Sequence, residues 1–138
     1  MKIKQLKFKY SKVMLLDDNE LDNFINTKII ESSHFAENIY VSTNGQSALE
    51  FLNNLSIVIS NSHPIYPELI FVDLNMPMMD GFQFIEHFIE NSKAKGSMPK
   101  LVILTSSISE EDKIRAKKIS QNIVFMHKPL TQTMLAEL

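Results

Sequence analysis

The chain has 138 residues, of which 44% are hydrophobic, and a formal net charge of −2 at pH 7. This length and apolar content are enough for one domain with its own core. The absence of cysteine excludes disulfides and thiolate metal sites, and the near-neutral charge gives no general case for nucleic-acid binding. No apolar run is long enough to span a bilayer, and the first residues lack the apolar core of a secretion signal. We therefore expect a single cytoplasmic domain with neither a membrane nor a nucleic acid as its partner.

The beginning of the chain is rich in lysine. Five of the 14 basic residues lie within residues 1–12, at Lys2, Lys4, Lys7, Lys9 and Lys12. Such a stretch can be an arm for an acidic partner or nucleic acid, but terminal segments are more often loosely ordered leaders or strand extensions. We expect residues 1–11 to form a basic leader and residues 12–138 to form the domain.

The first two elements bring acids together. An apolar run over about 12–17 predicts a strand, and the run ends in Asp17 and Asp18. Apolar residues then recur at helical spacing, which predicts a helix over about 20–33 with its apolar side on the sheet. These residues are Leu21, Phe24, Ile25 and Ile29. The acids from Asp17 to Asp22 crowd the amino end of this helix, where they suit either the helix dipole or a metal.

The next segment alternates again between strand and helix. Residues 38–42 read as a second strand, and Asn44-Gly45 turns the chain into a helix that we expect to continue to about residue 60. The stretch 56–67 contains Pro64 and Pro67 and carries no visible chemistry. A partner surface is possible there, but a surface loop insertion is the better interpretation.

A third strand ends in another acid. The continuous apolar run Leu69–Val72 suits a strand covered on both faces, and it leads to Asp73 and then to Met76-Pro77, where the strand must end. In an open α/β sheet, ligands bind just outside the carboxyl ends of strands. Asp73 alone would most often be a solvated strand-end acid, but Asp17 and Asp18 at another strand end change that interpretation.

The second half of the chain repeats the pattern. A helix is expected over about 82–94, closed by Lys93-Ala94-Lys95-Gly96, with a core face of Phe82, Phe84, Ile85, Phe88 and Ile89. A strand over about 100–104 leads to Thr105-Ser106-Ser107. A helix over about 109–120 follows, opened by Ser109 with Asp112 three residues later, a start similar to a capping box.

The last elements place an amine at a fourth strand end. A strand over about 123–127 leads to Lys128-Pro129, and Thr131 can cap a short final helix to Leu138. The preceding helix has a basic, mostly solvated face made by Lys113, Arg115, Lys117 and Lys118.

The four strand ends therefore offer acids, hydroxyls and one amine. Carboxylates gathered at neighbouring strand ends repel by roughly 4 kcal/mol per pair at ~4 Å and an effective dielectric of ~20, so a cation is needed among them. Mg²⁺ is favoured over Ca²⁺, because Mg²⁺ uses few carboxylates, keeps waters and takes further ligands from phosphate. The inventory fits a phosphoryl group carried by a carboxylate and held by a metal, a lysine and a hydroxyl.

With these residues in place, the sequence resembles the receiver domain of two-component response regulators, of the single-domain type, over about residues 12–138. The matching residues are Asp17-Asp18, Asp73 with Met76-Pro77 and Gly81, Thr105, and Lys128-Pro129. The resemblance implies an α/β fold of the flavodoxin-like, doubly wound type: a five-stranded parallel sheet of order 2-1-3-4-5 with five helices. That order would set the strands ending in Asp17-Asp18 and in Asp73 side by side.

The resemblance also implies a role for each site residue. Asp73 would accept a phosphoryl group from a sensor histidine kinase or a histidine phosphotransfer protein. Mg²⁺ would be bound by Asp18, Asp73 and the backbone carbonyl of Asn75, with Asp17 acting through a water. The phosphoryl-binding and switch residues would be Thr105, Ser106, Lys128 and Phe125, and the residues that influence the lifetime of the phosphoryl group would be Asn75 and Ser107.

On this interpretation the chain is not an enzyme for outside substrates but a phosphoacceptor signalling protein that acts on another protein, and a homodimer is possible. Its partner surface is expected to be acidic, or self-complementary through Glu137. The alternatives are a phosphorylation-independent binding module, whose mark would be a lost acid or lysine, and a receiver excised from a larger regulator or hybrid kinase. A flavodoxin-type electron carrier is disfavoured because Asp17 to Glu20 would repel a flavin phosphate, and a metal-dependent phosphatase because no general acid is placed for a leaving group.

Overall fold

The computed structural model describes residues 7–58, 65–92 and 98–138, which alternate strictly between strand and helix. All five strands are parallel and lie in the order β2-β1-β3-β4-β5, which confirms the predicted flavodoxin-like topology. The elements are β1 (Tyr10–Leu16), α1 (Glu20–Ser32), β2 (Ala36–Ser42), α2 (Gly45–Ile57), β3 (Leu69–Val72), α3 (Gly81–Ser92), β4 (Lys100–Thr105), α4 (Glu110–Ile119), β5 (Val124–His127) and α5 (Gln132–Ala136).

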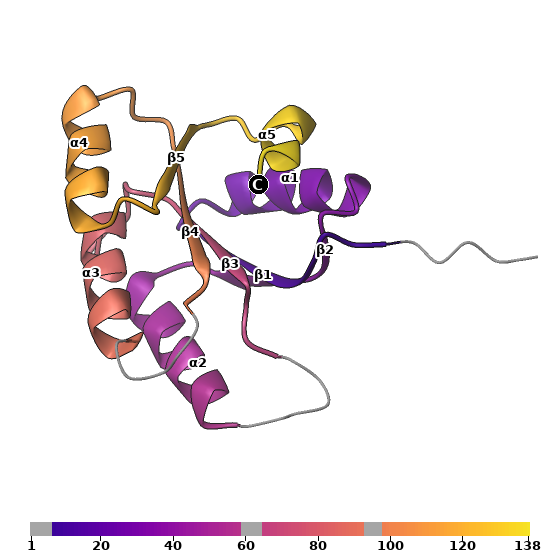
Figure 1. The fold of residues 1–138 in the computed structure, drawn as a ribbon, viewed down its shortest axis with the longest axis horizontal. Helices are drawn as coiled ribbons and strands as arrows, with labels where there is room; N and C mark the ends of the chain where they lie inside the picture. Colours follow the sequence, from indigo (N-terminus) through magenta and orange to yellow (C-terminus); the bar gives the residue numbers. More distant parts are fainter. Residues whose placement is uncertain (1–6, 59–64, 93–97) are drawn as a thin grey trace, which may run out of the picture.

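The sheet separates two helical layers. Helices α1 and α5 cover one face, and α2, α3 and α4 cover the other (Figure 1). Successive strand residues point to opposite faces, so Met14 and Leu16 of β1 belong to the core under α2, α3 and α4, whereas Val13 and Leu15 belong to the core under α1 and α5. Each residue of β3 is buried, as the continuous apolar run predicted.

Helix α3 carries the expected core face. Phe82, Phe84, Ile85 and Phe88 are buried, and the stacked rings of Phe84 and Phe88 have centroids 5.8 Å apart. The predicted caps are also found, since the side chains of Ser109 and Thr131 accept the backbone N–H groups that open α4 and α5.

Several element ends differ from the prediction. Strand β1 begins at Tyr10, two residues early, because Tyr10 donates its backbone N–H to Phe35 O at 2.9 Å; the strand extension considered for the basic stretch is therefore found. Strand β2 begins at Ala36. Helix α2 ends at Ile57 and Val58 is extended, so the expected continuation to residue 60 is wrong. The leader up to residue 6, the loop residues 59–64 and the closing segment Lys93–Gly96 lie outside the described residues.

Helix α1 is rotated relative to the prediction. Leu21, Phe24 and Ile25, expected on the sheet, are 65%, 61% and 42% exposed. The buried residues are instead Asn23, Asn26 and Ile30, which lie on the opposite side of the helix. The reason is a buried hydrogen bond. The Asn23 side chain donates to Asp17 O at 2.8 Å, and this bond turns the side of α1 that carries Asn23 towards the end of β1. The apolar spacing predicted the helix correctly but not the face that the sheet covers.

Helix α5 is short and yet closes its side of the core. It spans only Gln132–Ala136, but Leu135 and Leu138 are buried against the sheet. The backbone oxygen of Leu138 accepts hydrogen bonds from the Tyr10 hydroxyl at 2.7 Å and from Lys100 Nζ at 3.3 Å. Among the described residues, no helix has both the length and the apolar character needed to cross a membrane.

The β3–α3 connection packs against the end of β3 at a glycine. A Cβ atom on Gly81 would clash with the backbone oxygen of Asp73 and would lie 2.8 Å from Leu74 Cα. The Gly81 N–H also donates to Leu74 O at 3.0 Å, so the start of α3 is held directly against the strand end. A glycine at this position lets the helix approach the backbone of Asp73.

We expect Gly81→Ala to destabilise the fold by about 1 to 3 kcal/mol, because the added methyl meets backbone atoms that cannot move away independently. The matched control is Gly45→Ala, which is also the first residue of a helix and therefore gains the same helix propensity. Its Cβ would meet only the flexible side chain of Met79. Urea unfolding measures both variants, and a Gly81→Ala protein as stable as Gly45→Ala would contradict the close approach.

Candidate functional site

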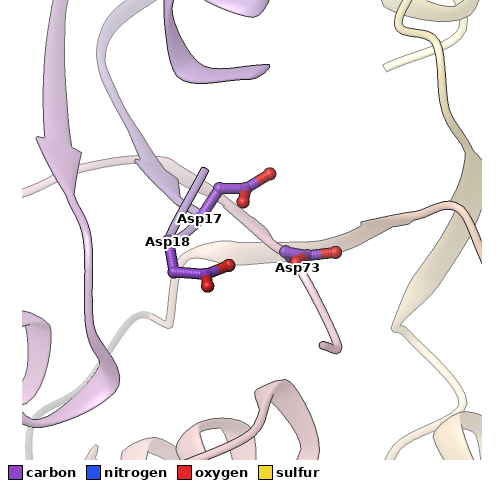
Figure 2. Close-up of side chains that lie close together, drawn as sticks. All are labelled: Asp17, Asp18 and Asp73. Atoms are coloured by element: carbon purple, nitrogen blue, oxygen red, sulfur yellow. The ribbon is translucent and has the colours of Figure 1, made fainter. Parts of the chain in front are cut away.

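Three carboxylates meet at the carboxyl ends of neighbouring strands. Asp17 and Asp18 follow β1 and Asp73 follows β3, and one oxygen from each lies within 4.8 Å of the others. Figure 2 shows the two side chains from the end of β1 and the one from β3 extending to the same side. Asp17 and Asp73 are buried whereas Asp18 is exposed. The strand order therefore gathers the acids as predicted.

Backbone and side-chain hydrogen bonds fix the two strand ends. Asp73 donates its N–H to Leu16 O at 2.9 Å, and Asp17 donates to Ser42 O at 3.1 Å, so each acid is tied to a neighbouring strand. The Asn19 N–H donates to Asp17 Oδ1 at 2.9 Å. Asn23, which the sequence analysis did not single out, holds Asp17 O from α1. The first turn of α1 is thus built onto the acidic strand end.

The loop after Asp73 is closed by a capping box. Asp80 accepts the Gln83 N–H at 2.8 Å, and the Asp80 N–H donates to Gln83 Oε1 at 3.0 Å. The pair Asp80 and Gln83 has the three-residue spacing of this motif, which is visible in the sequence. Asn75, in the same loop, is exposed, and its position leaves it open to a ligand.

Lys128 supplies positive charge to the cluster from the end of β5. Its Nζ lies 2.6 Å from Asp17 Oδ2, 2.8 Å from Asp22 Oδ2 and 3.6 Å from Asp73 Oδ1. Burial lowers the pKa of Lys128, but the hydrogen bonds to Asp17 and Asp22 and the charge of Asp73 outweigh it and raise the pKa above its ordinary value. Lys128 is therefore a permanent cation in this site. The contact between Lys128 and Asp22 was not predicted from the sequence.

Asp73 has the most perturbed carboxyl group of the site. Burial and the neighbouring charge of Asp17 raise its pKa from 3.8 to about 6, although Lys128 acts in the opposite direction. The longer distance from Lys128 to Asp73 than to Asp17 is consistent with this balance. The carboxylate remains mostly ionised at neutral pH, and the surroundings do not fully neutralise it.

The hydroxyl residues at the end of β4 and just after it form a separate network. Thr105 is fully buried, and its Oγ1 accepts the Ser107 N–H at 3.1 Å. Ser107 Oγ donates to Asp112 Oδ2 at 2.8 Å and accepts the Ser109 N–H at 3.2 Å. The expected reciprocal capping box is therefore only half made, because the Asp112 carboxylate is used by Ser107. Among the described contacts, none joins the Thr105 side chain to the acids.

The remaining predicted residues lie around this network. Ser106 is exposed, and its backbone oxygen is 3.1 Å from His127 Nε2. Phe125 is half-buried and packs against the core beneath α2, α3 and α4, so it is neither a fully buried core ring nor an exposed one. Its role as a switch stays a prediction.

The basic face of α4 is partly engaged. Lys113, Arg115, Lys117 and Lys118 are exposed, as predicted. Lys117 Nζ nevertheless donates to Ile123 O at 2.7 Å, and the Arg115 guanidinium lies 4.3 Å from the centre of the Phe82 ring and 3.8 Å from Glu86. Lys117 and Arg115 therefore make contacts within the molecule and are not purely solvated.

The donor set of the acidic cluster fits a hard divalent cation. All three candidate ligands are carboxylate oxygens, and their mutual separation of at most 4.8 Å is close to the ~3 to 4 Å between oxygens around Mg²⁺ at ~2.1 Å. Small side-chain movements would bring them to that distance. The cluster therefore offers a set of donors that fits Mg²⁺, and one of its carboxylates, that of Asp18, is exposed.

Comparisons with known proteins agree with this geometry. The family model for the response regulator receiver domain matches residues 13–138. A two-component response regulator from Cytophaga hutchinsonii is 30% identical, with a TM-score of 0.81 and 92% of each chain covered. The Mg²⁺ complex of the receiver domain of the histidine kinase CKI1 from Arabidopsis thaliana is 18% identical, with a TM-score of 0.80 and coverage of 92% of this chain and 89% of that one, and shares the fold.

Curated relatives include both short and long proteins. Response regulator Rcp1 of Synechocystis is 26% identical over 80% of this chain and 71% of its own length. A protein-glutamate methylesterase/protein-glutamine glutaminase of Geobacter sulfurreducens is 31% identical over 86% of this chain, but the match spans only 28% of that relative. The shared unit therefore makes up most of one of these relatives and little more than a quarter of the other.

The raised pKa of Asp73 predicts a pH-dependent stability. The native state holds this proton more tightly than the unfolded chain, so the contribution of Asp73 to metal-free stability falls as pH rises from about 4 to 6. Asp73→Asn should remove the penalty and stabilise the protein at pH 7 in EDTA by about 1 to 3 kcal/mol, since one pKa unit corresponds to ~1.4 kcal/mol. The gain should shrink towards pH 4.

Urea unfolding of both proteins across this pH range measures the difference, in which other titrating groups largely cancel. Glu20→Gln, which removes an exposed charge nearby, should change stability by less than about 0.5 kcal/mol. An Asp73→Asn protein no more stable than the wild type at pH 7 would show that the carboxylate is not strained by its neighbours.

Proposed function

Because the chain belongs to the receiver-domain family of response regulators, we propose that Asp73 accepts a phosphoryl group from a phosphohistidine and that this changes how the protein binds a partner. The family is a signalling module of two-component systems. The observation that carries the residue assignment is the convergence of Asp17, Asp18 and Asp73 at one edge of the sheet, with Lys128 reaching the same place from the end of β5.

The chemistry asked of Asp73 is an in-line displacement at phosphorus. One carboxylate oxygen attacks, the new P–O bond forms as the donor's P–N bond breaks, and the leaving imidazole is protonated. With a pKa of about 6, the carboxylate is ionised at neutral pH and available to attack. The transition state spreads negative charge over the phosphoryl oxygens, so the cation of Lys128 and the fixed positions of the strand ends contribute most.

Mg²⁺, when bound, would neutralise phosphoryl oxygens and orient them for transfer. We assign it to the carboxylates of Asp18 and Asp73 and the backbone carbonyl of Asn75. Asp17 is better suited to act through a water, because both of its carboxylate oxygens already have partners in Asn19 and Lys128. The exposed carboxylate of Asp18 is the member of the cluster most open to a cation.

The switch would begin at Thr105. A phosphoryl oxygen on Asp73 offers its hydroxyl a new acceptor, and the exposed, small Ser106 leaves that oxygen room. Movement of Thr105 would disturb its bond with the Ser107 N–H, and Ser107 in turn holds Asp112 and the start of α4. The half-buried Phe125 could then turn inward. A tenfold change in partner affinity needs only ~1.4 kcal/mol of such coupling.

Two residues, Asn75 and Ser107, are proposed to influence the lifetime of the phosphoryl group. Asn75 is exposed beside the acceptor, where it can meet an attacking water. The Ser107 hydroxyl already donates to Asp112, so it would have to give up this bond before donating to a phosphoryl oxygen or a water. We propose that both tune the rate of hydrolysis.

The phosphoryl donor is proposed to be a sensor histidine kinase or a histidine phosphotransfer protein. The exposed side chains of Leu21, Phe24 and Ile25 lie on α1, whose amino end borders the acids, so they offer apolar contact to a protein docked over the site. The downstream protein would bind around α4, β5 and α5. A homodimer and a cytoplasmic location stay predictions, as does the absence of activity on outside substrates.

The rival interpretations fit the site less well. A phosphorylation-independent binding module would be expected to lack an acid or the lysine, and here each is present and in contact with the cluster. A flavodoxin-type carrier would have to place a flavin phosphate against Asp17 and Asp18, where charge repulsion opposes it. A receiver that works as part of a longer regulator or hybrid kinase would use the same site.

The test is reaction with acetyl phosphate, a small phosphodonor. In Mg²⁺ the protein should gain one phosphoryl group that hydroxylamine removes, as expected for an acyl phosphate, and in EDTA it should gain none. Intact-mass spectrometry measures the label. Asp73→Asn and Asp18→Ala should each abolish it, the first by removing the acceptor and the second by weakening the cation site.

Glu20→Gln is the control, because it removes a nearby exposed charge without touching the cluster. It should label like the wild type. Equal labelling of Asp73→Asn would move the acceptor elsewhere, and equal labelling in EDTA would remove Mg²⁺ from the proposal.

A further inference from the structure

Lys128 makes a short contact that the proposed phosphotransfer does not use. Its Nζ lies 2.8 Å from Asp22 Oδ2 in the first turn of α1, which is closer than its 3.6 Å to Asp73 Oδ1. Asp22 is not a member of the acidic cluster formed by the three strand-end carboxylates. The ammonium group is therefore drawn away from the proposed acceptor and towards the helix.

Hydrogen bonds in the first turn of α1 hold Asp22 in place. Asn19 caps α1 by accepting the Asp22 N–H at 3.0 Å, and the Asn19 N–H in turn donates to Asp17 Oδ1. Asn23, the next residue, bonds Asp17 O. Asp22 therefore stands on a helical turn that is tied to the end of β1, so its carboxylate is held where Lys128 meets it.

We propose that Asp22 is a positioning residue that competes with the phosphoryl group on Asp73 for Lys128. The inference rests on the proposed function and adds a residue that sets the strength of the phosphorylated state. An ammonium has three N–H donors, and Asp17 and Asp22 occupy two of them at hydrogen-bond distance. The third donor can reach a phosphoryl oxygen, but the ammonium group lies closer to Asp22 than to Asp73 and moves fully towards that oxygen only as its contact with Asp22 is stretched.

Electrostatics acts in the same direction. The negative charge of Asp22 offsets part of the charge of Lys128 and also repels an anion arriving at Asp73. The side chain of Asp22 is 36% exposed, so water can solvate its carboxylate when Lys128 moves away. Asp22 therefore restrains Lys128 only modestly. Asp17, by contrast, is buried and keeps its bond from Asn19.

The experiment measures the affinity of the Mg²⁺-loaded protein for beryllofluoride, an inert mimic of the phosphoryl group, by ¹⁹F NMR titration. Asp22→Asn should bind it about three- to tenfold more tightly, the range expected for loss of one partly solvated charge-assisted contact. Asp22→Glu restores a carboxylate and should lie within about twofold of the wild type. Glu20→Gln removes a charge from the same turn and should leave the affinity unchanged.

A second readout needs neither metal nor phosphoryl mimic. In the metal-free protein, ¹H–¹⁵N spectra of lysine side chains should show a protected ammonium signal for Lys128, identified by its loss in Lys128→Arg. Asp22→Asn should weaken or remove that protection and Glu20→Gln should not. Unchanged protection would show that Asp22 does not hold the lysine, and the inference would fail.

The outcomes separate the two claims. Tighter beryllofluoride binding by Asp22→Asn alone supports competition. Unchanged or weaker binding, with a wild type that binds normally, overturns the competition and leaves phosphorylation of Asp73 intact. A wild type that does not bind beryllofluoride at all overturns the proposed function, and the role of Asp22 falls with it.

Discussion

The site depends on holding three carboxylates together against their mutual repulsion. Asp17 and Asp18 follow β1 and Asp73 follows β3, and the paired register of these two parallel strands keeps the backbones of the acids close together. Lys128 offsets part of the repulsion, and burial together with the charge of Asp17 still raises the pKa of Asp73. A site with this residual negative charge attracts a divalent cation, and with the cation an anionic phosphoryl group. The sheet, in which β3 is wholly buried, is the rigid support that makes such an arrangement possible.

Two sets of contacts connect this edge of the sheet to the surrounding helices, and they differ in chemistry. On one side, Lys128 connects the acids to α1 through Asp22, a contact between charges. On the other, Thr105 connects to α4 through Ser107 and Asp112, a chain of hydrogen bonds between uncharged and charged groups. In the proposed mechanism, the first contact would set how firmly a phosphoryl group is held, and the second chain would carry the effect of phosphorylation to the surface. The two routes use different side chains, although the Lys128 N–H donates to Thr105 O at 2.8 Å and so joins their backbones. A substitution confined to Asp22 should therefore leave the hydrogen bonds of Thr105 and Ser107 in place.

The fold and most of the acidic site were predictable from the sequence because both follow local patterns. The buried run before Asp73 and the acids after β1 predicted the strand ends, and the resemblance supplied the strand order. The rotation of α1 was not predictable from apolar spacing, since the buried bond from Asn23 to Asp17 O selects the polar side. The contact between Asp22 and Lys128 joins residues 106 positions apart, which no sequence spacing reveals. The end of α2 was set three residues too late because apolar residues 57–59 resembled a continuing helix.

The central claim is that one particular carboxylate accepts the phosphoryl group. Borohydride reduces an acyl phosphate of aspartate to homoserine, which marks the acceptor permanently, and tandem mass spectrometry of peptides then locates it. After treatment with acetyl phosphate and Mg²⁺, the account predicts homoserine at Asp73 alone, because Asp17 already has a partner at each carboxylate oxygen whereas Lys128 stays 3.6 Å from Asp73. Homoserine at Asp17, Asp18 or Asp22, or at no position, would contradict it.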